Sequence, residues 1–568
     1  MYIDIVPNRK SPPAILLRES VREGKKIVKK TIANLSSLTL EQAQAIRMVL
    51  KGESLVRPED HFDIVASQAH GHIAACLTAI KKLKVEQLLG SRRSRERDLV
   101  IAMLVSRIVD PESKLALSRN IDNTTLGVLL EAGDANEDEL YKAMDWLFER
   151  QKRIEKKLAA RHLHNGGRVL YDLSSSYFEG SCCALAAHGY NRDGKKGKLQ
   201  VNYGLLTDDR GCPVSISVFP GNTSDPETLN PQVEQLREDF NLDTVVLVGD
   251  RGMISQKQVD ELREYPGVDW ITALKSGAIR KLMNGGAIQL GLFDERNLFE
   301  LSHPDYPGER LVACRNPELA FRRANKRQAL LEATSRELDK VQGMIDRGFL
   351  KQKDKIGLRV GRIINKYKMA KHFILDIGER HLSYRVDEKK VAEEVSLDGI
   401  YIIRTSLSQG ALSSEDAVRH YKDLSHVEQA FRSIKTMDLL VRPIHHRLEG
   451  RVRAHLFICM LAYYVKWHML EAWRPLLFAD EDLITKKERD PVKASERSKA
   501  AHKKVHSKRL PDGSPVQSFQ SLLKNLATIV RNTCRRKDVP DKDTTFTIDT
   551  KPSKQQTKAL QLVKTIKM

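Results

Sequence analysis

The chain has 568 residues, which is more than one hydrophobic core usually serves, so several domains are expected. Its 95 Lys and Arg outnumber its 74 Asp and Glu, which gives a net charge of +21 and a pI near 9.5. This excess favours a polyanionic partner such as nucleic acid, although a generally basic solvated surface would give the same composition. The seven Cys include no Cys-x-x-Cys pair, so their spacing indicates neither a zinc site nor a disulfide scaffold and fits a reducing cytoplasm.

No segment is predicted to enter a membrane. The opening MYIDIVPNRK is followed by charged residues, unlike a signal peptide. The longest apolar run, Leu456 to Val465, is too short to span a bilayer and predicts a buried helix. We therefore expect a cytoplasmic protein without a membrane partner.

Residues 1–90 read as a small amino-terminal module. Residues 14–32 predict a hairpin around Glu23-Gly24, and Thr39 with Gln42 predicts a capping box for a helix that ends near Gly52. His70-Gly71-His72 precedes a further helix. Two His without other ligands are more often turn and packing residues, so no chemistry is assigned to them.

Residues 91–165 are helical by hydrophobic period and are expected to form a helical domain before the core. The segment begins with a basic cluster that includes Arg92 and Arg93. Such a cluster either grips phosphate near a helix start or forms a solvated charged turn, and the sequence favours neither interpretation.

The segment 166–275 alternates strands and helices in a fixed order. Strands are predicted at 168–178, 198–207, 213–219, 244–250 and 268–275, with a helix at 225–240, capped by Ser224 or Asp225, and another at 255–265. Three strands, helix, strand, helix, strand is the order of a ribonuclease-H-like fold. We expect this segment and residues 413–475 to form one such core, a mixed five-stranded sheet with helices.

Three acidic residues stand out within this core. Asp172 lies in the middle or at the end of a buried strand, and Asp250 closes the strand TVVLVGD, where α/β sheets commonly build sites. Glu428 lies on a helix predicted from Ser413 to Leu440. Tyr421, Leu424, Glu428, Phe431 and Lys435 share one face of that helix, which is expected to pack on the core. A carboxylate on such a face is costly unless it is paired or bound to a metal, although a surface helix with ordinary charges is the simpler alternative for one Glu.

Residues 276–412 are more than the core requires and predict an α+β insertion. Strands are expected at Arg310–Cys314, His372–Ile377 and Gly399–Arg404, with a charged helix from Pro317 to about Ile345. Residues 476–568 form a basic carboxy-terminal region. Its stretch 486–509 has ten Lys or Arg against three acids and is either a DNA-contacting arm or a solvated linker. An amphipathic helix from Phe519 to Ile529 is expected to dock on the body or on a second subunit.

The spacing Tyr421-x2-Leu424-x3-Glu428-x6-Lys435 resembles the signature helix of DDE transposases from bacterial insertion sequences, the cut-and-paste group with Tyr, Arg, Glu and Lys at these positions. Leu424 departs from that pattern by replacing Arg. Further blocks resemble the same group in the same order: residues 188–193, 197–200, 219–225 and 249–253. The resemblance covers about residues 166–275 and 413–465 and implies the ribonuclease-H-like core expected above.

The resemblance implies an enzyme that cleaves DNA at transposon ends and joins the 3′-hydroxyls to target DNA, with Asp172, Asp250 and Glu428 as its catalytic acids. Three carboxylates without His or Cys form a hard oxygen site that suits Mg²⁺ or Mn²⁺. Two ions about 4 Å apart support in-line phosphoryl transfer, with Asp172 as the bridging ligand.

The resemblance also implies the partners, and it implies that the helical residues 91–165 form a DNA-end-binding domain. Tyr421 and Lys435 are expected to contact the transposon end, and Arg251 and Arg432 are candidates for the charge that Leu424 lacks. The substrates are double-stranded DNA with terminal inverted repeats and a target, held by a homodimer in a paired-end complex near the bacterial nucleoid.

Two other functional interpretations stay open at this stage. One is a transposase-derived DNA-binding protein without catalysis, against which the presence of all three acids counts. The other is a stand-alone metal-dependent nuclease. The sequence of the recognised ends, the target preference and a cleavage route through a DNA hairpin are not encoded in any recognisable pattern.

Overall fold

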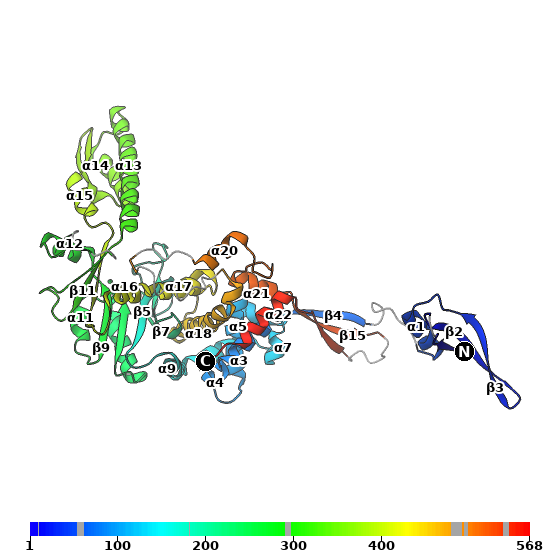
Figure 1. Cartoon of the computed structure of the whole chain (residues 1–568). Coiled ribbons are helices and arrows are strands. Elements are labelled where there is room, and N and C mark those ends of the chain that lie inside the picture. The colour runs from blue at the N-terminus through cyan, green and yellow to red at the C-terminus, as the bar shows by residue number, and fades with distance from the viewer. Residues whose placement is uncertain are drawn as a thin grey trace. The chain divides into compact units, whose positions relative to one another are not determined.

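The computed structural model describes residues 1–8, 11–53, 62–180, 182–289, 293, 297–478, 491–492, 498–537 and 545–567. The chain forms two compact units (Figure 1). The smaller unit combines Met1–Ala69 with Ile529–Lys551, and the larger combines His70–Thr528 with Pro552–Met568. The finer five-segment division stays a prediction. Among the described residues, none of the helices has both the length and the apolarity needed to cross a bilayer.

The smaller unit contains two three-stranded antiparallel sheets. The first has the order β1-β2-β3, and α1 packs on it through a core of Ile3, Ile15 and Ala43. Its hairpin and its capping box, in which Thr39 Oγ1 accepts from Gln42 N at 3.2 Å, confirm the predictions. The second sheet has the order β16-β15-β4. The bounds are β1 Tyr2–Val6, β2 Ala14–Glu23, β3 Lys26–Asn34, α1 Leu40–Leu50, β4 Phe62–Ala69, β15 Val530–Arg536 and β16 Thr545–Asp549.

The larger unit begins with helices, as predicted for residues 91–165. Its centre is α5, whose residues from Asp98 to Ile108 are all buried against α3, α8 and α18. Helices this apolar on every side are stable only inside a core. The bounds are α3 Gly71–Lys82, α4 Val85–Leu89, α5 Arg95–Val109, α6 Lys114–Asn120, η1 Ile121–Asn123, α7 Leu126–Leu130, α8 Glu137–Phe148 and α9 Gln151–His162.

One mixed sheet organises the rest of the larger unit, in the order β10-β11-β14-β9-β8-β5-β6-β7. β5 pairs antiparallel with β6 and parallel with β8, and β8 pairs parallel with β9. The expected five-stranded sheet is therefore wrong in its size: there are eight strands. The strands of the predicted insertion continue the hydrogen-bond ladder beyond β9, because a free edge of backbone N–H and C=O groups is available there. The bounds are β5 Gly167–Tyr177, β6 Gln200–Asp208, β7 Pro213–Pro220, β8 Val245–Gly249, β9 Val268–Ala273, β10 Leu298–Leu301, β11 Arg310–Arg315 and β14 Ile400–Thr405.

The helix expected at 225–240 is three short pieces: η2 (Pro226–Thr228), α10 (Leu229–Glu234) and the π-helical turn η3 (Gln235–Asp239). The predicted cap is wrong, because Asp225 has helical backbone angles and its carboxylate pairs with Arg192 instead. The next helices are α11 (Gln256–Leu262), which was predicted, and α12 (Ser276–Asn284).

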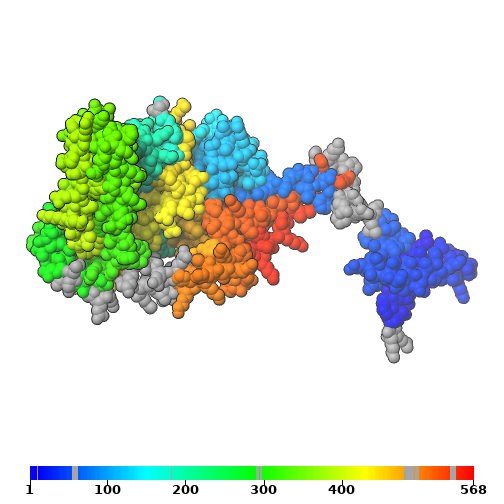
Figure 2. All heavy atoms as spheres, turned by 90° about the horizontal axis from the view of Figure 1, so that it is seen from above, coloured from blue at the N-terminus to red at the C-terminus, as the bar shows by residue number. Residues whose placement is uncertain are grey.

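The part of the insertion that lies off the sheet forms its own small core. Helices α13 and α14 pack with the hairpin β12–β13 around Leu338, Val341, Ile356 and Val360. Figure 2 shows the green atoms of α13 and the yellow-green atoms of α14 and α15 gathered at one end of the larger unit. The bounds are α13 Pro317–Asp346, α14 Lys353–Tyr367, η5 Ala370–His372, β12 Phe373–Gly378, β13 His381–Val386 and α15 Glu388–Val395.

The single helix expected from Ser413 to Leu440 is segmented into α16 (Ser414–Lys422), α17 (Leu424–Arg432) and the π-helical turn η6 (Ser433–Met437). Behind it lies α18 (Glu449–Trp473), which is the buried helix that the apolar run predicted. Lys466 Nζ of α18 donates to Ser433 Oγ of η6 at 2.7 Å. The basic stretch 486–509 lies partly outside the described residues. The predicted amphipathic helix is α21, and it docks on the body, where Phe519 packs on Trp473. The remaining bounds are η7 Arg474–Leu476, α20 Lys499–Ser507, α21 Phe519–Ala527 and α22 Lys554–Lys564.

Candidate active site

The parallel pairing of β5 with β8 places two of the predicted acids side by side. Tyr171 is in register with Gly249, so the next residues along the two strands are Asp172 and Asp250. Asp172 continues in β5, where it faces Leu205 of β6, while Asp250 begins the loop after β8. The two carboxylates therefore emerge at the same edge of the parallel pair, which is where open α/β sheets build sites.

Glu428 joins them from α17, but on a different part of the helix from the one expected. The buried seam of α17 and η6 is Leu424, Val427, Phe431 and Ile434, with spacings of three, four and three. Glu428 lies beside this seam and is exposed. The expectation that it interrupts the buried face is wrong, because Val427 takes that place in the packing.

One cavity of about 680 Å³ brings the three acids together. It is open, and most of its lining side chains are polar or charged. They come from β5, the β5–β6 connection, the loop before η2, the end of β8, α17 and the chain after η6. The lining residues are Asp172, Leu173, Ser174, Tyr190, Arg192, Asp193, Asp225, Asp250, Glu428, Phe431, Arg432, Lys435, Thr436 and Arg442.

Asp172 carries the strongest electrostatic signature of the three. Burial, helped by the nearby charges of Asp250 and Glu428, raises the pKa of its carboxyl to about 7, against a lowering by the Leu173 amide and Arg192. Leu173 N donates to Asp172 Oδ1 at 2.8 Å. Tyr421 Oη donates to Asp250 Oδ1 at 3.2 Å, and burial together with Asp250 raises the pKa of that phenol. The charges of Asp250 and Glu428 disfavour the ionised form of Asp172, a condition that a bound cation relieves.

Lys435 lies in the same cavity but is held by other groups. Its Nζ is 2.7 Å from Asp193 Oδ1 and 3.1 Å from Ser174 Oγ, and Arg442 pairs with the same Asp193 oxygen. Burial lowers the pKa of Lys435, whereas Asp193 raises it. The side chain expected to contact a phosphate is therefore part of a buried ion-pair network, which the π-helical turn η6 brings within reach of Asp193.

Four charged residues of the site were not assigned by sequence reasoning: Arg192, Asp193, Asp225 and Arg442. Arg192 pairs with Asp225 and lies over the Tyr190 ring, 5.6 Å from its centre. A signal existed for three of them, because Arg192 and Asp193 lie in the block 188–193 and Asp225 ends the block 219–225. The sequence blocks did not indicate what these residues contact, because their side chains come together only in the folded structure.

The remaining predicted DNA-binding residues are dispersed. Arg432 is exposed and lines the acidic cavity. Arg251 is exposed and lines a separate cavity of about 630 Å³, whose basic residues include Arg280, Arg323, Lys326 and Lys368.

Arg92 and Arg93 lie before α5, far from both cavities in the sequence. Arg92 is exposed. Arg93 pairs with Asp98 at 2.6 Å and with Glu131 at 3.1 Å, so its guanidinium joins α5 to the end of α7.

The donor set of the acidic cavity fits a divalent cation. Asp172, Asp250 and Glu428 supply carboxylate oxygens, the ligands that Mg²⁺ and Mn²⁺ prefer, and Asp172, whose pKa is raised first by burial, also has the charges of Asp250 and Glu428 near it. The nearby cations Arg192 and Lys435 are each paired to another acid, Asp225 and Asp193. They therefore do not neutralise the triad fully.

Two family models that match this chain both describe transposases. Residues 179–465 match the family described as the transposase DDE domain, and residues 3–61 match the amino-terminal domain of IS1634 family transposases. Asp250 and Glu428 lie inside the first match, and Asp172 precedes it by seven positions. None of the curated proteins matches. The solved structure of the piggyBac transposase synaptic complex with hairpin DNA is 10% identical, with a TM-score of 0.34 over 80% of this chain and 76% of that chain.

Proposed function

Because this chain belongs to the DDE transposases of insertion sequences, we propose that Asp172, Asp250 and Glu428 are its catalytic acids. The chain is a DNA transposase, and enzymes of this family use divalent metal ions. The observation that carries the residue assignment is the shared cavity, into which β5, β8 and α17 each deliver one carboxylate. The register of β5 against β8 supports it.

We also propose that the sheet from β7 to β9 is a ribonuclease-H-like core. In chain order its strands lie third, second, first, fourth and fifth, with the second antiparallel to the first. β10, β11 and β14 then extend its far edge. In this arrangement the first and fourth strands are neighbours, which accounts for the proximity of Asp172 and Asp250.

Mg²⁺ or Mn²⁺, in two ions, would be held by the three carboxylates and would supply Lewis-acid activation of the attacking oxygen and stabilisation of the leaving oxygen. Asp172 is the most enclosed of the three and is the proposed shared ligand. Tyr421 orients Asp250 through its 3.2 Å hydrogen bond. With water as the nucleophile, the centre nicks DNA. With a DNA 3′-hydroxyl, the same centre joins strands.

A basic surface beside this centre provides a path for DNA. Arg251 follows Asp250 directly in the chain, and its side chain lines the cavity that Arg280, Arg323 and Lys326 also line. All four are exposed, so their charges are free to release counterions from a phosphate backbone. We propose that the DNA strand leaves the acidic cavity over this surface.

Joining two transposon ends to one target needs two centres, so we propose a homodimer that assembles on paired ends in the bacterial cytoplasm.

Leu424, in the position of the usual Arg, is buried and cannot contact phosphate. Arg432 and Arg192 line the cavity and are the proposed substitutes.

The test compares the full-length protein with Asp172→Asn, Asp250→Asn and Glu428→Gln on DNA that carries the element's own inverted repeats, with Mg²⁺ at fixed low salt. Each variant should lose cutting and joining by about a thousandfold, because a metal ligand supports several kcal/mol of transition-state stabilisation. Binding to the ends should persist. The matched control is Glu238→Gln, an exposed carboxylate on η3, which should leave the rate unchanged.

The products and the binding data separate the alternatives. Joined as well as cut strands support a transposase over a stand-alone nuclease. Binding without any metal-dependent product in the wild type would favour a lapsed DNA-binding protein. Equal activity in wild type and variants would refute the assignment of the acids.

A further inference from the structure

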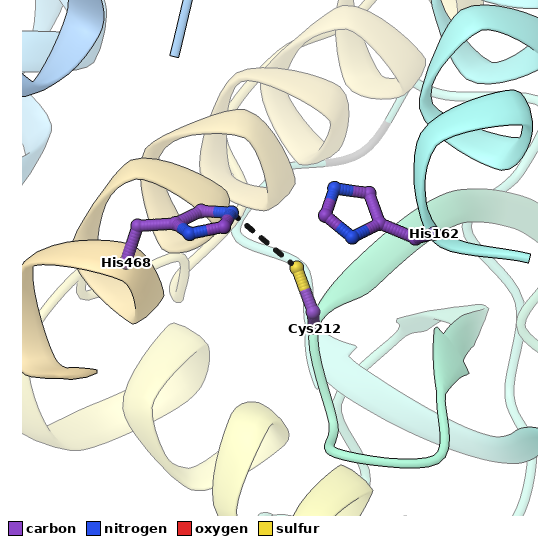
Figure 3. Close-up of side chains that lie close together, drawn as sticks. All are labelled: His162, Cys212 and His468. Carbon is purple, nitrogen blue, oxygen red and sulfur yellow. Dashed lines mark hydrogen bonds between the residues drawn. The ribbon is translucent and has the colours of Figure 1, made fainter. Parts of the chain in front are cut away.

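Away from the acidic cavity, three side chains from distant parts of the sequence converge: His162, Cys212 and His468 (Figure 3). One ligand atom from each lies within 4.8 Å of the other two, and Cys212 Sγ is 3.8 Å from His468 Nε2. We propose that these residues bind a divalent transition-metal ion, with Zn²⁺ foremost. In a tetrahedral zinc site with the usual bond lengths, S and N ligands are separated by about 3.5 Å, so Cys212 and His468 are close to ligand distance and His162 would move inward on binding.

The surrounding groups already orient these ligands. His162 Nε2 is 3.1 Å from Tyr464 Oη, which leaves Nδ1 for the metal and provides the outer hydrogen bond that fixes a ligating imidazole. The Cys212 amide donates to Asp208 Oδ1 at 2.9 Å, which fixes the backbone that carries the thiol.

The charge around the cluster is compatible with a cation. Asp208 Oδ2 lies 4.0 Å from His162 Nδ1 and pairs with Arg210 at 2.8 Å, and Glu471 lines the same cavity as Arg161, so each of these two cations has an acid beside it in this cavity. A metal-bound Cys212 would contribute a thiolate as a further negative charge. A cavity of about 520 Å³, lined by His162 and His468, gives the ion an entry path and the fourth coordination position a water molecule.

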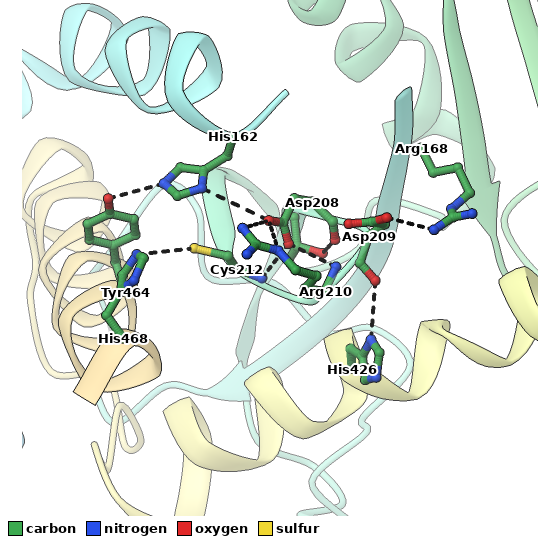
Figure 4. A network of polar contacts seen from close by, with 10 residues as sticks. His162, Arg168, Asp208, Asp209, Arg210, Cys212, His426, Tyr464 and His468 are labelled. Carbon is green, nitrogen blue, oxygen red and sulfur yellow. Dashed lines mark hydrogen bonds and ion pairs between the residues drawn. The ribbon is translucent and has the colours of Figure 1, made fainter. Parts of the chain in front are cut away.

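The three ligands lie on three elements: the end of α9, the turn between β6 and β7, and α18. Figure 4 shows that the same turn reaches α17, where His426 Nδ1 is 3.3 Å from the Asp209 carbonyl oxygen. Gly211 in this turn has φ +83°, and a Cβ there would lie 2.7 Å from His426 Cβ. A metal at Cys212 would therefore fix this turn against the helix that carries Glu428. The proposed role is structural and separate from the carboxylate chemistry.

The test uses full-length protein that has been stripped with a chelator and titrated with Co²⁺. A thiolate ligand gives a sulfur-to-cobalt charge-transfer band in the near ultraviolet, which the carboxylates of the acidic cavity cannot give. We expect this band to saturate at one Co²⁺ per chain and to be displaced by Zn²⁺. Cys212→Ser and His468→Ala should abolish it, while Cys182→Ser, at an exposed cysteine, should leave it intact.

A second readout covers variants that fail to fold. Cys212 is buried and reacts with a thiol reagent only when the chain opens locally, so in the wild type Zn²⁺ should slow its modification over long incubation, as measured by mass spectrometry, and should leave the rate at exposed Cys182 unchanged. No band in the wild type would overturn the proposal. So would a band that survives Cys212→Ser, or equal modification of Cys212 with and without Zn²⁺.

Discussion

At the residue scale, the site is a balance of acids and cations rather than three carboxylates alone. Asp172, Asp250 and Glu428 are left with unneutralised charge, because three of the cations that line their cavity are paired with other acids: Arg192 with Asp225, and Lys435 and Arg442 with Asp193. A neutralised triad would have little affinity for a divalent ion. These ion pairs therefore leave the negative charge of the three carboxylates available to a divalent ion. They also hold the loops that carry Arg192 and Asp193 in place.

Lys435 provides the test at this scale. Lys435→Met leaves buried Asp193 with Arg442 as its remaining partner, and removing one member of a buried ion pair costs up to about 3–5 kcal/mol when no other partner remains. We expect a loss of roughly 2 kcal/mol, seen as a fall of about 2 °C in the unfolding midpoint by calorimetry. Lys340→Met, at an exposed Lys paired with Glu337, is the control and should leave the midpoint unchanged. An unchanged midpoint together with lost DNA affinity would instead support the phosphate contact expected from the sequence.

At the element scale, α9 is tied to the sheet by one buried acid, Glu155. Its Oε1 accepts from Gln151 Nε2 at 2.8 Å and from the Ile216 amide of β7 at 3.1 Å, and its Oε2 accepts from Gln235 Nε2 at 3.1 Å. Burial raises the pKa of this carboxyl to about 7, despite these hydrogen bonds. The junction between the helical region and the sheet is therefore sensitive to pH.

The sign of this sensitivity follows from proton binding. The folded chain holds the Glu155 proton up to about pH 7, whereas the unfolded chain releases it near the ordinary value of 4.5, so this group's stabilising contribution falls as pH rises from 4.5 to 7. The loss is about 3 kcal/mol when complete. Glu155→Gln should flatten the dependence of the unfolding midpoint on pH across this window, and Glu238→Gln should leave it as in the wild type. Equal slopes in wild type and Glu155→Gln would show that another group governs it.

At the scale of the whole molecule, part of the net charge of +21 can be assigned to one surface of the structure. Exposed Arg280, Arg323 and Lys326 line the cavity that begins at Arg251, next to the acidic site. In contrast, Arg93 and Arg327 are each committed to acids, Arg93 to Asp98 and Arg327 to Asp398. Only part of the basic excess is therefore available to a DNA partner.

The salt dependence of DNA binding measures how many of the basic side chains contact phosphates. Each phosphate contact contributes about 0.9 to the slope of log K against log salt concentration. Arg280→Gln/Arg323→Gln/Lys326→Gln should lower the slope by roughly 2 to 3, measured by fluorescence anisotropy over a salt series. Lys340→Gln, on the same helix as Arg323 and Lys326 but paired with Glu337, should leave the slope unchanged. A triple variant with the wild-type slope would place the DNA elsewhere on the protein.

Local patterns in the sequence were sufficient for most elements. The capping box at Thr39, the strand that ends before Asp250 and the long helix from Pro317 all depend on neighbouring residues, and each forms as predicted. The seam of α17 was assigned to the wrong residues because Glu428 and Val427 are adjacent, and a helical period alone does not decide which of two neighbours faces the core.

The sequence by itself determined the order of the core strands, pointed to the three acids proposed as catalytic and carried the resemblance to DDE transposases. Tertiary structure alone decided the size of the sheet, the pairing of Lys435 with Asp193, and the convergence of His162, Cys212 and His468. The physical reason is distance along the chain: 256 positions separate Cys212 from His468, and 242 separate Lys435 from Asp193. Periodicity and spacing report contacts within a few turns, whereas strand register and the packing of α18 bring such residues together.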